Sequence, residues 1–149
     1  MQHSFWPEIT HNHIFIITLI VWILAQATKV VIGVFTEKRF NFRWFIGTGG
    51  MPSSHTAGIA ALATCVGLDQ GFDTIAFAIA ASFAMVTMFD AQGVRRATGQ
   101  QATVLNKMME DIYWKGQIEE KRLKELVGHT PVQVVAGFVF GIFCALILY

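Results

Sequence analysis

The sequence predicts an all-helical membrane protein, a bundle of about four transmembrane helices that forms a single domain over residues 1–149. Three observations predict this fold class. Hydrophobic residues make up 54% of the chain and charged residues only 14%, which is unusual for a soluble domain of this length. One apolar run is long enough to span a bilayer by itself, and three more apolar runs follow it.

The first apolar run, Ile14 to Phe35, has 22 residues and predicts the first transmembrane helix. At about 1.5 Å per residue it is long enough to cross a hydrocarbon core of about 30 Å. The preceding segment, Met1 to His13, lacks the positive region of a signal peptide, and no small-residue cleavage site follows the run. The run is therefore interpreted as a retained span.

Lys29 is a single charge inside this span, and Gln26 lies one turn earlier on the same helix face. A cation within a membrane is costly and needs a partner or a role. Two interpretations stay open. Lys29 either extends to the lipid headgroups along the helix surface or faces a bound phosphate.

The connector after this span, Thr36 to Gly50, is polar and basic, with Lys38, Arg39 and Arg43. It leads to a motif directly ahead of a second apolar run, Gly49-Gly50-Met51-Pro52-Ser53-Ser54-His55-Thr56-Ala57-Gly58.

This motif has the residue types of an anion site. The start of a helix offers backbone N–H groups and the positive end of the helix dipole. Pro52 suits the first turn or its approach, Ser53 and Ser54 can cap the helix or donate hydrogen bonds, and His55 can carry a proton at neutral pH. The alternative is an ordinary loop whose serines only cap a helix.

The next two apolar runs predict a helical hairpin. The first, His55 to Leu68, is short for a full crossing, and its many alanines and glycines favour close helix packing over lipid exposure. A tight turn at Asp69-Gln70-Gly71 follows, and Phe72 to Phe89 predicts a third span.

A polar cluster from Asp90 to Gln101 lies at the border where this third span should end. Arg95 and Arg96 are typical of the cytoplasmic end of a span, whereas Asp90 suggests a carboxylate held in a charged pocket. Ala102 to Val127 then alternates apolar and charged residues with a break expected at Gly116, which predicts amphipathic helices on the membrane surface or over a site.

Gly128-His129-Thr130-Pro131 precedes the last apolar run, Val132 to Tyr149, in which Gly137 and Gly141 form the small-xxx-small pattern of close helix contact. His129 thus repeats the placement of His55 just before a membrane helix. Two histidines in this position favour a shared polar site.

The distribution of basic residues predicts the topology. Of the eleven Lys and Arg residues, three lie in the connector after the first span and seven in the long segment after the third, while the turn between the second and third spans has none. With four spans, both basic segments fall on one side, which the positive-inside rule makes cytoplasmic. The polar residues would then meet at the cytoplasmic membrane surface: Arg43, His55, Asp90, Arg95, Arg96 and His129.

Two imidazoles, several cations and serine hydroxyls are the groups needed to bind a phosphate ester and transfer its phosphoryl group. The scheme requires no metal and no cofactor, and the sequence shows no clustered His/Cys ligands or close carboxylate pair. Cys65 and Cys144 lie within apolar runs and predict neither a disulfide nor a metal site. The net charge of +1, without a dense basic run, does not indicate nucleic-acid binding.

These motifs carry a resemblance. Pro52-Ser53-Ser54-His55 is similar to the second motif of the type 2 phosphatidic acid phosphatase superfamily, which includes vanadium-dependent haloperoxidases, and the stretch from Gly128 to Gly137 resembles the histidine end of its third motif. With Phe89-Asp90-Ala91-Gln92-Gly93-Val94-Arg95-Arg96-Ala97-Thr98-Gly99-Gln100-Gln101-Ala102, the blocks resemble the small divergent branch found in bacteria and plastids.

The resemblance implies roles for individual residues. His129 would be the nucleophile that forms a phosphohistidine, and His55 the general acid for the departing alcohol. Ser54 would bind phosphate. The third-motif arginine would be Arg95 or Arg96, and the first-motif cations Lys29 and Arg43, with Lys38 and Arg39 as rivals.

The chain also departs from the superfamily pattern. The superfamily pattern has an acidic residue four positions after the nucleophilic histidine, and this chain has Gln133 at that position. The side-chain carbonyl of Gln133 can accept the ring N–H, but it stabilises a cationic ring less than a carboxylate does. Asp90 is a second source of negative charge. Arg96 lies 33 positions before His129, so the tertiary fold must close the site.

The sequence therefore predicts a lipid phosphate phosphatase with its site on the cytoplasmic face, in the inner membrane of a bacterium. A cytoplasmic site favours phosphatidylglycerophosphate as the substrate over phosphatidic acid or undecaprenyl diphosphate. The alternatives are a non-catalytic protein that binds anionic lipids and a transport component that uses Lys29 and Asp90. The glycine face of the last span is compatible with a homo-oligomer.

Overall fold

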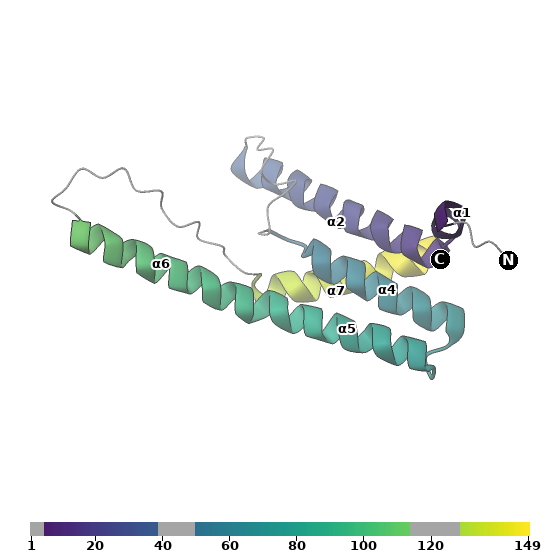
Figure 1. The fold of residues 1–149 in the computed structure, drawn as a ribbon. Helices are drawn as coiled ribbons and strands as arrows, with labels where there is room; N and C mark the ends of the chain where they lie inside the picture. Colours follow the sequence, from purple (N-terminus) through teal and green to yellow (C-terminus); the bar gives the residue numbers. More distant parts are fainter. Residues whose placement is uncertain (1–4, 39–49, 114–128) are drawn as a thin grey trace.

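The computed structural model describes residues 5–38, 50–113 and 129–149, and all secondary structure in these ranges is helical (Figure 1). In chain order the helices are α1 (Phe5–Thr10), α2 (His13–Glu37), α4 (Ser54–Gln70), α5 (Ile75–Gln92), α6 (Val94–Tyr113) and α7 (Pro131–Leu148). This architecture confirms the predicted all-helical fold class.

Four of these helices form a bundle in which the chain reverses direction at each passage. Figure 1 shows α2 and α5 running one way and α4 and α7 the other, so that α2 and α5 end where α4 and α7 begin. We call this end of the bundle the site end. At the opposite end, the hydroxyl of Tyr149 donates a hydrogen bond of 3.1 Å to Asp69.

Helix α4 is the centre of the bundle, because it packs against α2, α5 and α7. Its small residues make this position possible. Ala57, Ala60 and Ala61 are buried, and a Cβ atom at Gly141 of α7 would overlap the backbone carbonyl of Ala57. The two backbones therefore approach closely, as the glycine pattern of the last span predicts.

The larger apolar side chains point outward, as expected for a protein that lies in lipid. Among the helices that the structure describes, three are long and apolar enough to cross a membrane: α2, α5 and α7. Helix α4 has 17 residues, which is about 26 Å at the usual rise per residue and slightly less than a full crossing. The four predicted spans therefore correspond to three helices long enough to cross a membrane, α2, α5 and α7, and to the shorter central helix α4.

The boundaries of the four apolar helices α2, α4, α5 and α7 differ from the predicted ranges by up to three residues. The hairpin helix α5 begins at Ile75 rather than Phe72, because the Thr74 side chain caps it by accepting a hydrogen bond of 3.3 Å from Phe77 N–H. Gly71 makes the turn between α4 and α5 with a φ of 100°, a conformation that favours glycine.

The polar border after α5 is more helical than predicted. Gly93 alone separates α5 from α6, which begins at Val94 rather than near Ala102 and extends beyond the bundle in line with α5 (Figure 1). Arg95 and Arg96 thus lie in the first turn of a helix. The predicted break at Gly116 lies outside the described residues, and the placement of this segment on the membrane surface stays a prediction.

Candidate functional site

The first part of the candidate site is the start of α4. Ser53 is its N-cap, and the Ser53 hydroxyl oxygen accepts hydrogen bonds from the backbone N–H of Thr56 at 3.4 Å and from its hydroxyl at 3.0 Å. Ser53 and Ser54 are both buried, and Pro52 stands just before the cap. The glycine-rich motif therefore forms a capped helix start, as its residues predict.

The second part is the start of α7, which lies against the start of α4. The backbone N–H of Ser53 donates a hydrogen bond of 3.2 Å to the carbonyl of Gln133. Gly137, one turn further along α7, lets the two helices meet, since a Cβ at this position would lie 2.5 Å from the Ser53 carbonyl oxygen. Two helix N-termini, each with a positive dipole end, are thereby held together.

His129 lies at this junction with only 1% of its surface exposed. Gln133 Oε1 lies 3.2 Å from His129 Nδ1 and 3.1 Å from the backbone N–H of Thr130. Because a backbone N–H can only donate, the atom facing it is the amide oxygen, and Nδ1 must then carry the ring proton. Nε2, which is buried, is therefore the nitrogen with the lone pair in the neutral ring.

Gln133 also stabilises the helix that positions this histidine. Thr130 is the N-cap of α7, and its side chain accepts a hydrogen bond of 3.3 Å from Gln133 N–H. Together with the Gln133 contact to Thr130 N–H, this forms a capping box. A single side chain thus caps the helix and orients the ring of His129.

Lys29 of α2 comes to the same end of the bundle. It is only 5% exposed, and its Nζ donates a hydrogen bond of 3.1 Å to Gln26 Oε1. Its aliphatic stem packs against Gly50, where an added Cβ would lie 3.0 Å from Lys29 Cγ. The side chain is therefore enclosed at the site end rather than extended along an exposed helix surface, and a role in binding phosphate stays a prediction.

His55 and Asp90 also lie at the site end, on α4 and α5 respectively. His55 is exposed in the first turn of α4, directly after Ser54, and Asp90 is half-buried in the last turn of α5. The two predicted histidines thus differ in environment: His129 is enclosed, whereas His55 faces outward. An exposed imidazole exchanges protons readily, and an enclosed one is held in a single orientation.

Three predicted phosphate-binding residues are not part of the described geometry. Arg43 lies outside the described residues, and the side chains of Arg95 and Arg96 are also outside them, although their backbone lies in α6. Within residues 5–38, 50–113 and 129–149, no group of three or more His, Cys, Asp or Glu side chains is arranged to hold a metal ion.

Sequence reasoning missed the backbone contacts that join the motifs. Neither the Ser53–Gln133 hydrogen bond nor the contact of Gly50 with Lys29 is visible in residue spacing, because each joins segments far apart in the chain. The capping box was readable, since a threonine followed three residues later by glutamine is its usual pattern.

The fold and the polar end define a small helical membrane protein with two motifs brought together at one end of its bundle. A comparison with protein families identifies it further: the chain belongs to the divergent PAP2 family, whose model matches residues 10–144. It is also 41% identical over 152 residues to the uncharacterized membrane protein YuiD of Bacillus subtilis (strain 168), covering 95% of this chain and 96% of that protein. No solved structure matches the chain.

Proposed function

We propose that the chain is a metal-independent lipid phosphate phosphatase that works through a phosphohistidine on His129. The observation that carries this proposal is the junction of α4 and α7, where the Ser53–Gln133 hydrogen bond joins two helix N-termini beside a buried, oriented imidazole. Paired helix N-termini favour the binding of a dianionic phosphate, and an oriented lone pair favours attack on it.

The reaction has two steps. His129 Nε2 attacks phosphorus, a P–N bond forms, and the bond between phosphorus and the lipid alcohol oxygen breaks as His55 donates a proton to that oxygen. Water then attacks the phosphohistidine, His55 takes up its proton, and inorganic phosphate leaves with His129 restored. The exposed position of His55 supports a role in which protons are exchanged with water.

The remaining site residues bind charge in this proposal. Ser53 offers its hydroxyl and Ser54 its hydroxyl and backbone N–H at the start of α4, and Lys29 offers a buried cation. Arg43, Arg95 and Arg96 supply guanidinium groups for the equatorial phosphate oxygens. Asp90 holds one of these cations or a histidine in place.

The substrate is inferred from topology. Basic residues concentrate in the segments at the site end, which the positive-inside rule assigns to the cytoplasm of a bacterial inner membrane. Phosphatidylglycerophosphate, a lipid phosphate monoester made on that face, is the proposed substrate, and phosphatidic acid and undecaprenyl diphosphate are the alternatives.

Phosphate release from these three lipids tests the proposal, using the purified native chain in detergent with a chelator and no added metal. We expect release from one lipid, inhibition by vanadate, and loss of release in His129→Ala. His13→Ala is the matched control, because His13 lies at the opposite end of the bundle and should leave release unchanged. Release that persists in a folded His129→Ala protein would contradict the mechanism.

A second function has a specific observation in its favour. Gln133 gives the ring of His129 a neutral partner where the superfamily pattern has a carboxylate, which lowers the stability of a charged intermediate. In a non-catalytic protein, the same pocket would bind the phosphate of an anionic lipid without turnover. Vanadate binding to a folded native chain that releases no phosphate from any of the three lipids would favour this function.

A further inference from the structure

The bundle contains a long apolar cavity that is separate from the polar junction. Its volume is about 550 Å³, within the range of about 300–1,000 Å³ typical of ligand pockets. The lining comes from α4, α5, α7 and the turn before α5, and among its side chains only Thr64 and Gln92 are polar. We call this cavity the α5–α7 groove, because side chains of both helices line it.

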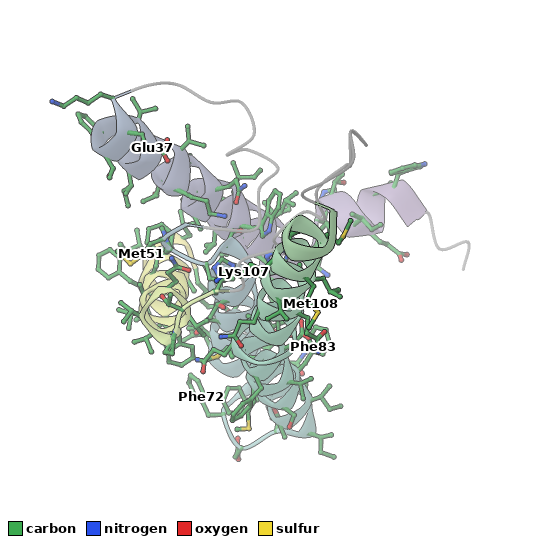
Figure 2. All side chains as sticks on the ribbon, turned by 90° about the vertical axis from the view of Figure 1, so that its left-hand side faces the viewer. Glu37, Met51, Phe72, Phe83, Lys107 and Met108 are labelled. Carbon is green, nitrogen blue, oxygen red and sulfur yellow. The ribbon has the colours of Figure 1, made fainter. Side chains whose placement is uncertain are left out.

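The walls of the groove have an ordered arrangement. Ala60 and Ala63 of the central helix provide a shallow floor, and Phe138, Ile142 and Leu146 form the wall on α7. Figure 2 shows Phe72 in the space between α7 and α5, whereas Phe83 lies on the other side of α5. Phe83 is accordingly absent from the lining and is 60% exposed.

The groove runs from the site end toward the opposite end. Gln92, the last residue of α5, lines its beginning, and Phe77 lines its end fifteen residues away, about 22 Å along the helix. There the rings of Phe72 and Phe77 meet edge to face, with centroids 5.0 Å apart. The groove therefore has Gln92 at the site end and two contacting aromatic rings at the opposite end.

The site end of the groove lies close to the starts of α4 and α7. Ala60 follows Ser54 by six residues on α4, about 9 Å, and Phe138 follows Pro131, the first residue of α7, by seven residues, about 11 Å. The lining therefore begins about two helical turns beyond the two helix starts, within reach of the apolar chain of a lipid whose phosphate lies at His129.

We propose that the α5–α7 groove binds one hydrocarbon chain of the lipid phosphate substrate and so orients its phosphate toward His129; this inference rests on the proposed function. Moving a chain from the bilayer into the groove brings little hydrophobic gain, because lipid tails are as apolar as the lining. The benefit is orientation, since a chain fixed along α5 and α7 limits the positions that its phosphate can occupy.

The position of Gln92 favours this occupant over another protein. An apolar helix of a second copy that covered the groove along its whole length would bury the polar Gln92 side chain against apolar side chains, which is costly. A single chain leaves Gln92 beside the polar part of the same lipid. The groove also starts at the end of the bundle where both motif histidines lie.

A substitution within the groove tests the proposal. Ala81 lines the groove and is half-buried, so Ala81→Phe adds a ring to the hollow without removing an existing contact. We expect KM for the long-chain lipid in proteoliposomes to rise about tenfold, the effect of a moderate steric penalty. Turnover of a short-chain analogue with the same headgroup should stay within about twofold of the native value, because it does not reach Ala81.

The matched control is Val86→Phe, which adds a ring to the lipid-exposed face of the same helix. Val86 is 65% exposed and does not line the groove. This variant should keep the native KM for both substrates. Equal effects of Ala81→Phe and Val86→Phe, or an equal effect of Ala81→Phe on both substrates, would overturn the proposal.

A measurement without turnover separates this inference from the proposed function. A lipid phosphate with a photoreactive group at its chain end is crosslinked to the His129→Ala protein, and the sites are mapped by mass spectrometry. Crosslinks at Phe72, Phe77 and Leu146 that disappear in Ala81→Phe would support the groove even if the native chain releases no phosphate. Crosslinks spread over Ile79, Phe83 and Val86, or a second copy crosslinked across the groove, would overturn it.

Discussion

At the scale of single residues, the main result is the double role of Gln133. Its side-chain oxygen accepts from Thr130 N–H and from His129 Nδ1, so the cap of α7 and the orientation of the ring depend on the same atom. The departure from the superfamily pattern at this position is therefore compatible with an ordered histidine, although it supplies no negative charge.

Replacing Gln133 by Glu tests this role. The shape and the two acceptor contacts are kept, and a negative charge is added beside a ring that becomes cationic when phosphorylated. We expect phosphate release to increase, whereas Gln133→Leu, which leaves two donors without their acceptor, should lower it about tenfold or more and destabilise the fold by about 1–3 kcal/mol. Steady-state kinetics and thermal unfolding measure both effects. Faster release by Gln133→Leu than by the native chain would contradict the assignment.

Lys29 is the residue whose environment the fold clarifies most. Its side chain is enclosed rather than exposed along α2: Nζ donates a hydrogen bond to Gln26 Oε1, and the aliphatic stem packs against Gly50. A buried cation is costly in a membrane span, which makes Lys29 a candidate for a functional role.

Lys29→Met keeps the unbranched stem as far as Cε and removes the ammonium group. If Lys29 binds phosphate, the variant should still unfold cooperatively on heating, and its half-inhibitory vanadate concentration should rise about tenfold, as expected for the loss of a charged hydrogen bond. Vanadate titration and thermal unfolding of the same preparation measure both quantities. Unchanged vanadate inhibition with a lower melting temperature would show a purely structural role.

At the scale of elements, the contact of α4 with α7 decides whether the two motifs meet. The glycine pattern in α7 and the alanines of α4 predict a close approach, but the pattern does not name the partner helix. The structure shows that the partner is α4, because Gly137 lies close to the carbonyl of Ser53 and Gly141 close to the carbonyl of Ala57.

Gly141→Ala tests this contact. The added methyl group would overlap the backbone of α4, which must shift, so we expect a loss of stability of about 1–3 kcal/mol and weaker phosphate release. Gly58→Ala is the control, because its Cβ would lie 3.5 Å from Trp22, an ordinary contact distance. Thermal unfolding in detergent compares the two variants. Equal melting temperatures would show that α4 and α7 do not need their close approach.

At the scale of the whole molecule, the alternating directions of α2, α4, α5 and α7 place the starts of two motif-bearing helices at one end. In the sequence, most basic residues follow the ends of α2 and α5, so the orientation of the bundle decides which face of the membrane holds the candidate site.

Cysteine labelling in intact cells measures this orientation. In a background with Cys65→Ala and Cys144→Ala, Lys38→Cys reports on the site end and Asp73→Cys on the opposite end, since both positions are exposed. We expect a membrane-impermeant maleimide to label Asp73→Cys in intact cells and Lys38→Cys only after permeabilisation. The reverse pattern would place the site end outside the cytoplasm and remove the argument for phosphatidylglycerophosphate.

The sequence by itself determined the fold class, the positions of the apolar helices to within about three residues, and the two histidine motifs, because these depend on local composition and on caps formed by near neighbours. Only the tertiary structure decided that α4 is central, that the backbone carbonyl of Gln133 accepts from Ser53, and that the stem of Lys29 packs against Gly50. These contacts join residues far apart in the chain, and their geometry depends on how closely two backbones approach. The spacing of residues along the sequence does not determine that distance.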